Sequence, residues 1–431
     1  MSQTHYQWIR EYGRRMDSDL RCSLIQRLHL LRYIPCFFHR ATLSLMERLS
    51  RVPVLVQVDQ HAKVSASLQN TLYNNPSSVD FFNSIHMFRM NLNLNQLHKM
   101  MKHPEVKRVY LDRKVYALLD TAAPAVNAPL AWKYGNTGER TGIAIIDTGI
   151  HAHPDLMNPE PRIAAFKDFV KGKTSPYDDN GHGTHCAGDA AGNGYASDGK
   201  YKGPAPGAKL IGVKVLDKAG SGQLSDVISG IEWCIQNREK YNIRVLSLSL
   251  GSRTNSSYKD DPVAQAVEKA WDHGITVVAA AGNDGPDPGT ISSPGIHPRI
   301  ITVGASNDKG TPTIRDDEAA SFSSRGPTPD GVTKPDLLAP GTDIVSLRVP
   351  RSYIDKMSPD SRINRHYTTL SGTSMATPIV AGMAAVLLTH QPDLTPDEVK
   401  RELVQAAQSL ELPPNVQGEG LAQAADSWFK G

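Results

Sequence analysis

Short apolar runs rich in Ile, Val and Ala alternate with amphipathic stretches from about residue 121 onward. Short runs bounded by turn residues predict buried strands, and apolar positions at helical spacing predict helices. We expect strands over residues 142–147, 209–216, 244–250, 275–281 and 300–304. We expect helices over residues 225–237 and 262–273, the second ended by Gly274. This alternation indicates an α/β domain with a doubly wound, mainly parallel sheet, in which ligands bind beyond the carboxyl ends of the strands.

The pattern before residue 120 indicates a separate, smaller unit. Residues 52–58, 85–92 and 106–115 alternate as strands, and residues 95–103 form a short helix. Residues 1–50 add two amphipathic helices, whose role the sequence does not indicate. We therefore expect three parts, which are a helical N-terminal extension (1–50), a small α+β unit (51–119) and a large α/β domain (120–431).

Composition and charge narrow the class of protein. With 431 residues, 39% of them hydrophobic and 21% charged, the chain is long enough to bury a large core. Residues 1–120 carry 17 Lys and Arg against 9 Asp and Glu, whereas the rest carries 30 against 35. The basic residues are scattered among apolar ones, which favours helix faces lying against an acidic partner domain over an arm that binds nucleic acid.

The first residues, the lengths of the apolar stretches and the spacing of the cysteines bear on the cellular compartment. The first 32 residues are interrupted by charges where a secretory signal needs an apolar run, and no apolar stretch approaches the roughly 20 residues of a membrane span. The cysteines are widely spaced, at Cys22, Cys36, Cys186 and Cys234. We expect a cytoplasmic protein without disulfides or a membrane partner.

Three Gly-rich blocks supply a carboxylate, an imidazole and a hydroxyl, at Asp147-Thr148-Gly149, His182-Gly183-Thr184-His185 and Gly372-Thr373-Ser374-Met375-Ala376. A serine hydroxyl is a poor nucleophile at neutral pH, so it needs a base to take its proton and a carboxylate to orient that base. Asn283, in a fourth block after a predicted strand, can supply an amide to a developing oxyanion, although Asn-Asp-Gly is also good turn material.

These blocks, in this order, resemble those of the subtilisin-like serine proteases, or subtilases. The resemblance, strongest over residues 141–391, implies an endopeptidase with Asp147, His182 and Ser374 as catalytic triad and with Asn283 and the Ser374 N–H as oxyanion donors. It implies protein and peptide substrates and no cofactor for the chemistry. His185 is expected to be structural.

The resemblance extends to substrate binding. Residues 220–223 and 249–252 match the two segments that pair with an extended substrate, and Gly251 would let its main chain approach. Leu250, Ala280, Ala281 and Gly282 would wall a roomy apolar pocket for the residue before the cut. The predicted substrate-binding residues are Gly220, Gly222, Ser249, Leu250, Gly251, Ala280 and Gly282.

Residues 51–119 are similar in pattern to the ferredoxin-like inhibitor and chaperone prodomain of subtilases, so the chain would carry its own intramolecular inhibitor. Residues 116–119 would lie in the cleft like a product, with autoprocessing near residues 118–120. The alternative is an uncut interdomain linker, which the Ala and Pro content of residues 121–128 fits as well.

Several features leave alternatives open. His182, His185 and Cys186 could be metal ligands, but the Glu of the H-E-x-x-H pattern is missing. Asp155 matches a calcium ligand of secreted subtilases, yet a helix-cap or turn role suits it equally and the family's calcium loop is not evident. Residues 346–366 form a lid, a partner surface or an inert loop.

Cys186 resembles the free cysteine of thiol-containing subtilases, with packing as its expected role. The alternatives to a protease are a catalytically silent peptide-binding protein and a regulator that responds to oxidation of Cys186.

Overall fold

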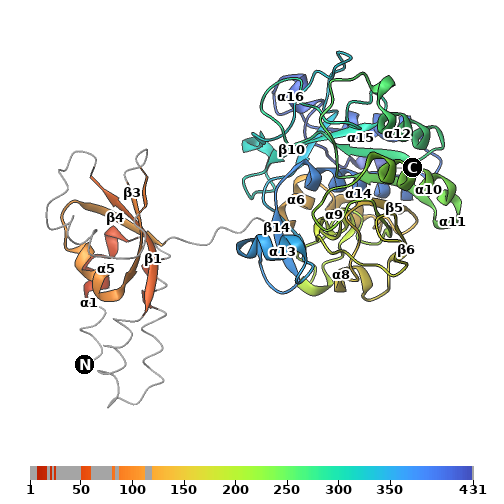
Figure 1. The fold of residues 1–431 in the computed structure, drawn as a ribbon. Helices are drawn as coiled ribbons and strands as arrows, with labels where there is room; N and C mark the ends of the chain where they lie inside the picture. The colour runs from red at the N-terminus through yellow and green to blue at the C-terminus, as the bar shows by residue number, and fades with distance from the viewer. Residues whose placement is uncertain are drawn as a thin grey trace. The chain divides into compact units, whose positions relative to one another are not determined.

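The computed structural model describes residues 7–16, 20–21, 24–25, 50–59, 80–82, 87–111 and 119–429. The chain divides into two compact units, residues 1–115 and 116–431, which Figure 1 draws in red to orange and in yellow to blue. The predictions made for Cys22, Cys36 and residues 116–118 concern positions outside the described residues.

The first unit is built on an antiparallel sheet in the order β2-β3-β1-β4. Its strands are β1 (Arg51–Val58), β2 (Asp80–Phe82), β3 (Met87–Asn93) and β4 (Val106–Leu111). Helix α5 (Leu94–Met101) follows β3 and is started by a capping box between Asn93 and Gln96. Apolar residues on both sides of residue 50, among them Ile9 in α1 (Gln7–Glu11) and Val54 in β1, share one core.

The second unit contains the mainly parallel sheet that the sequence predicted, in the order β11-β10-β9-β8-β5-β7-β6 with β12 beside β10. Every pair in it is parallel except β10 with β11. The strands are β5 (Gly142–Asp147), β6 (Ile163–Asp168), β7 (Lys209–Lys214), β8 (Ile243–Leu248), β9 (Thr276–Ala280), β10 (Ile301–Asn307), β11 (Glu318–Ala319) and β12 (Leu337–Pro340). All six residues of β5 are buried, as expected for a strand covered on both faces.

Helices flank this sheet (Figure 1). Helices α9 and α14 pack on each other, and α10 and α12 form a second pair. The helices are α6 (Leu119–Ala125), α7 (Pro129–Lys133), α8 (Pro154–Met157), α9 (His182–Ala191), α10 (Leu224–Gln236), α11 (Arg238–Tyr241), α12 (Pro262–Asp272), α13 (Tyr353–Met357), α14 (Thr373–His390), α15 (Pro396–Ala406) and α16 (Pro414–Gln417). The hairpin of β13 (Ile344–Leu347) and β14 (Tyr367–Leu370) leads into α14.

Helix α14 comes closer to a membrane span than the sequence analysis expected. Its 18 residues, with a mean hydropathy of 1.3, are long and apolar enough to cross a bilayer, but 89% of them are buried inside the unit. Such burial is typical of the central helix of a folded domain.

Residues 121–128 do not form a plain linker, because Ala122, Ala123, Val126 and Ala128 belong to the core of the second unit. Helix α6, which ends at Ala125, contacts β12 and β13. The stretch immediately after the predicted cleavage site is therefore an integral part of the large domain.

Candidate active site

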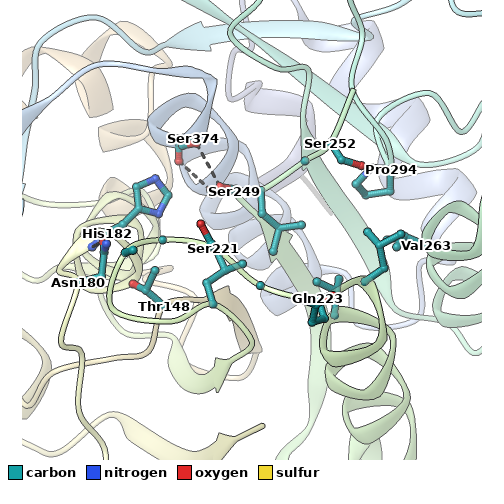
Figure 2. A pocket seen from close by; sticks show the side chains of 18 of the residues that line it. Thr148, Asn180, His182, Ser221, Gln223, Ser249, Ser252, Val263, Pro294 and Ser374 are labelled. Carbon is teal, nitrogen blue, oxygen red and sulfur yellow. Dashed lines mark hydrogen bonds between the residues drawn. The ribbon is translucent and has the colours of Figure 1, made fainter. Parts of the chain in front are cut away.

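The predicted chemical groups meet at the carboxyl edge of the central strands. Asp147 ends β5, His182 opens α9, and Ser374 is the second residue of α14. Asn283 comes three residues after β9. His182 and Ser374 line one cavity, as Figure 2 shows. Open parallel sheets bind their ligands at this edge.

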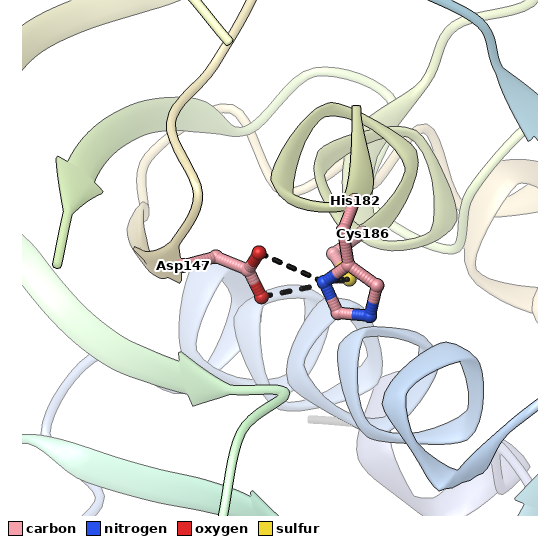
Figure 3. A group of neighbouring side chains, drawn as sticks. All are labelled: Asp147, His182 and Cys186. Atoms are coloured by element: carbon pink, nitrogen blue, oxygen red, sulfur yellow. Dashed lines mark hydrogen bonds and ion pairs between the residues drawn. The ribbon is translucent and has the colours of Figure 1, made fainter. Parts of the chain in front are cut away.

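Asp147 and His182 form a short hydrogen bond. Nδ1 of His182 lies 2.8 Å from Oδ1 of Asp147, which also accepts the N–H of Thr148 at 2.7 Å. The Asp147 carboxylate is fully buried, and Figure 3 shows the second ring nitrogen pointing away from it. Burial lowers the pKa of His182, but its interactions with Asp147 and Cys186 together outweigh this effect, so the pKa is raised well above 6.5.

Ser374 is not hydrogen-bonded to His182 in this structure; its hydroxyl donates instead to the carbonyl of Ser249 at 3.1 Å. The Ser249 hydroxyl in turn donates to the Ser374 carbonyl at 2.7 Å. A rotation about χ1 of Ser374 is enough to redirect its hydroxyl, and such bonds are often loose without substrate. Because Ser374 lies in the first turn of α14, its N–H has no carbonyl one turn earlier to bind.

The side chain of Asn283 is held by its carbonyl oxygen. Oδ1 accepts the N–H of Thr373 at 2.9 Å and the hydroxyl of Thr373 at 3.1 Å. These bonds do not use the NH₂ group, and Asn283 lines a smaller cavity together with Ser374. An amide anchored in this way is suited to donate to an oxyanion beside Ser374.

Asp178, whose role the sequence did not predict, organises the turn before His182. Its carboxylate accepts the N–H of Gly181 at 2.8 Å, the hydroxyl of Thr148 at 3.0 Å and the hydroxyl of Thr184 at 2.6 Å. The role of Lys214 was not predicted either. It is fully buried, and its Nζ donates to the Thr148 carbonyl at 2.6 Å. Only the position of Asp178 four residues before His182 could have hinted at such a role.

His185 has the structural role that the sequence analysis expected. Its ring is fully buried, with Nδ1 2.9 Å from Asp189 and Nε2 3.1 Å from the Ile344 carbonyl. Both nitrogens are therefore occupied, which removes His185 from the alternative metal site.

Cys186 lies below the triad as a buried thiol. Its Sγ is 3.4 Å from the Ser374 carbonyl, 3.8 Å from Nδ1 of His182 and 4.0 Å from Oδ2 of Asp147. The ligand atoms of Asp147, His182 and Cys186 lie within 4.8 Å of one another. The first two are already bonded to each other, as the dashed lines of Figure 3 mark. Burial raises the pKa of the Cys186 thiol to about 11, which disfavours the reactive thiolate.

A cavity of about 610 Å³ runs between the two predicted substrate segments. Figure 2 shows His182 and Asn180 at one end of it and Val263 and Pro294 at the other. The predicted residues that line it are Gly220, Gly222, Ser249, Leu250 and Gly251. Gly251 serves the protein's own packing, because a Cβ there would lie 3.0 Å from the Ser293 carbonyl.

A second cavity of about 180 Å³ adjoins the first at Leu250, Gly251 and Ser374. Ala280 and Gly282 line it as predicted, whereas Ala281 is fully buried and packs with Ile291 and Ile296. The lining also includes an exposed ion pair, with Arg253 Nε 3.0 Å from Asp284, which the sequence analysis did not anticipate. The expected apolar pocket thus has a charged rim.

Asp155 does not offer a calcium site. Its carboxylate is fully buried and accepts the Tyr367 hydroxyl at 2.7 Å and the Ala196 N–H at 2.9 Å. The neighbouring groups are His153 and Arg162, of which Arg162 donates to the Asp155 carbonyl. The Asp155 carboxylate already accepts hydrogen bonds and lies beside a cationic side chain. Calcium instead requires a shell of several available oxygen ligands, so this site does not fit it. Its place in the first turn of α8, after the cap residue His153, agrees with the alternative cap or turn role.

Comparison with known proteins agrees with this geometry. Residues 138–422 match the sequence profile of the subtilase family. The chain is 45% identical to Serine protease AprX of Bacillus subtilis (strain 168), over 98% of each chain, and 38% identical to Subtilisin Savinase of Lederbergia lenta, over 69% of this chain and 94% of that one.

Among solved structures, S41 Psychrophilic Protease matches with a TM-score of 0.57 and 33% identity, covering 67% of this chain and 93% of that one. Sphericase matches with a TM-score of 0.54 and 31% identity, covering 67% and 93%. The chain therefore belongs to the subtilase family and is a subtilisin-type serine endopeptidase.

Proposed function

We propose that Ser374 is the nucleophile of this endopeptidase, His182 its general base and Asp147 the group that orients the base. The observation that carries the proposal is the 2.8 Å bond between Asp147 and His182, with His182 and Ser374 lining one cavity. His182 takes the Ser374 proton as the hydroxyl attacks the substrate carbonyl, and it then gives that proton to the leaving amine. Water then attacks the acyl-enzyme while His182 takes a proton from it, and His182 returns that proton to Ser374 as the carboxylic acid product leaves.

The oxyanion formed in each step is stabilised by two donors, the Ser374 N–H and the Asn283 amide. The Thr373 bonds that fix the amide carbonyl support this role. Loss of one such donor typically costs about 3 kcal/mol of transition-state stabilisation.

The preferred residue before the cut is large and apolar. Leu250, Ala280 and Gly282 in the smaller cavity support this preference. The competing preference is an acidic or basic residue, which the Arg253–Asp284 pair at the rim would contact.

The N-terminal unit acts as an intramolecular inhibitor that the protease itself removes near residues 118–120. The antiparallel sheet with its own core and the opposite net charge of the two parts support this role. The free buried thiols of Cys186 and Cys234 support a location in the cytoplasm, which is a reducing compartment.

One experiment tests these assignments together. The full chain and its Ser374→Ala variant are incubated and analysed by intact mass spectrometry, alongside hydrolysis of peptides that differ only in Phe, Leu, Lys or Glu before the cut. We expect only the wild type to lose its N-terminal region and to cleave, fastest after Phe or Leu. Cleavage by the variant contradicts the triad, and preference for Lys or Glu contradicts the apolar pocket.

A further inference from the structure

The loop of residues 348–366, which joins β13 to β14, reaches the substrate cleft. Within it, α13 is preceded by the N-cap residue Ser352, whose hydroxyl accepts the N–H of Asp355 at 3.3 Å. Tyr353 and Ile354 line the larger cavity together with His182 and Leu216. The loop therefore brings two apolar side chains to the end of the cavity that holds His182.

Backbone hydrogen bonds tie this loop to the turn before His182. The N–H of Tyr353 donates to the Asp179 carbonyl and the N–H of Ile354 to the Asn180 carbonyl, both at 3.0 Å. Gly181, the next residue, has φ 106° and allows the loop to pack closely, because a Cβ there would lie 2.8 Å from Ser352 Oγ. Tyr353 and Ile354 thus keep a fixed position relative to His182.

Asp355 makes the loop rigid from within. Its buried carboxylate accepts bonds from Arg348 Nε at 2.5 Å, Arg362 Nε at 2.7 Å and the Arg351 N–H at 2.8 Å. Burial raises the pKa of Asp355, but these bonds outweigh it and lower the pKa to about 2. These bonds join the two ends of the loop through one carboxylate, which favours a fixed wall over a lid.

The two cavities are placed to receive alternate side chains of an extended substrate. They adjoin at Gly251 and Ser374, where the scissile carbonyl would lie. Successive side chains of a strand point to opposite sides. If the residue before the cut fills the smaller cavity, the residue before that one points toward His182, Leu216 and Ile354.

We propose that Tyr353 and Ile354 are specificity-determining residues, which form an apolar wall for the substrate residue two before the cut. This wall gives the protease a preference for a large aliphatic side chain over glycine at that position. The proposal rests on the proposed role of Ser374 as nucleophile.

The test uses two peptides that share Phe before the cut and carry Leu or Gly one residue earlier. The measured quantity is the ratio of kcat/KM for the Leu and Gly peptides, with the full chain and its variants. We expect the wild type to favour Leu, and Ile354→Ala to lower the ratio about tenfold, as is usual for lost methylene contacts in a pocket. Met357→Ala is the matched control, because Met357 is in the same helix, is 65% exposed and does not line the cavity.

Three results would overturn the wall. The first is an unchanged Leu/Gly ratio of kcat/KM in Ile354→Ala, and the second is an equal fall of that ratio in Met357→Ala. The third is an equal loss of activity toward both peptides in Ile354→Ala, which would show that the loop serves to hold His182 in place. A wild type that cleaves neither peptide contradicts the proposed triad instead. In that case the ratio of the two peptides' dissociation constants, measured for the same three proteins, tests the wall independently of cleavage.

Discussion

The candidate active site around His182 and the buried cluster around Asp155 contain the same pair of groups but have opposite electrostatics. In both, a histidine lies next to a fully buried aspartate. The pKa of His182 is raised well above 6.5, whereas burial lowers the pKa of His153 to about 4. The proximity of a carboxylate is therefore not enough to define a catalytic base.

The difference lies in how each ring is bonded. Nδ1 of His182 bonds directly to its carboxylate at 2.8 Å, while Nδ1 of His153 accepts the Asp155 N–H at 3.2 Å and lies 3.6 Å from Oδ1. Nε2 of His153 donates to the His366 carbonyl at 2.9 Å, whereas His182 lines the cavity. A base needs a bonded carboxylate on one nitrogen and access to substrate on the other.

Replacement of His182 should have the largest effect. We expect His182→Ala to lower kcat on the order of 10⁶-fold, the loss found when the base of a serine protease triad is removed. His153→Ala should leave kcat within a few-fold, because its ring nitrogens are bonded within the protein. Steady-state hydrolysis by the two variants separates these outcomes, and a comparable loss in both would remove the distinction between the two regions.

Asp147→Asn should produce a smaller loss, about 10⁴-fold in kcat, because the amide favours the wrong histidine tautomer. The pH dependence sharpens this prediction. His182 must be neutral to act as a base, and its pKa is raised. The kcat/KM of the wild type should therefore increase with pH, and the midpoint of this increase should lie above pH 6.5. Without the Asp147 charge the midpoint should move to lower pH. A pH profile with the same midpoint in both proteins would argue against Asp147 as the cause.

Asp155→Ala should reduce stability and leave the chemistry intact. It leaves the Tyr367 hydroxyl and the Ala196 N–H without their buried acceptor, at a cost of about 2 to 4 kcal/mol. Thermal unfolding in the Ser374→Ala background, which prevents self-digestion, measures this loss. The exposed Asp360→Ala is the control and should unfold like its parent. If chelation of calcium lowered the stability of the parent to that of Asp155→Ala, Asp155 would be a metal ligand after all.

Cys186→Ala should have the smallest effect, less than about fivefold in kcat/KM, because the thiol takes no part in the proposed chemistry. Alkylation of Cys186 by iodoacetamide in the folded protein should be slow, since the thiol is buried and its pKa is raised to about 11. Buried Cys234 provides an internal reference for unfolding in the same mass-spectrometric experiment. Rapid, selective modification of Cys186 with loss of activity would favour the thiol-responsive alternative.

The sequence predicted those parts of the molecule that depend on local pattern. Strand β5 was expected at the residues where it is found, because a buried parallel strand is a continuous apolar run. The blocks holding Asp147, His182 and Ser374 could be located because each is contiguous, and strand ends bring them together. The ends of other elements differ by a few residues, as for β7, which ends at Lys214 and not at 216.

Features that depend on tertiary packing could not be predicted. The bonds from Asp178 and Lys214 to Thr148 join residues that are 30 and 66 positions apart in the chain, and no local pattern predicts them. Ile354 lies in the short helix α13 within a long connection, and the backbone bonds to residues 179 and 180 hold it at the cleft. A family match suggested calcium at Asp155, but Tyr367, more than 200 residues later, fills that carboxylate.

Covalent labelling of the nucleophile tests the central claim most directly. Phenylmethylsulfonyl fluoride forms a sulfonyl ester on an activated serine with loss of fluoride, and peptide mapping by mass spectrometry locates it. We predict one ester, at Ser374, formed rapidly in the wild type, slowly in His182→Ala and not at all in Ser374→Ala. An ester at another serine, or equal labelling rates in the wild type and His182→Ala, would contradict the proposed triad.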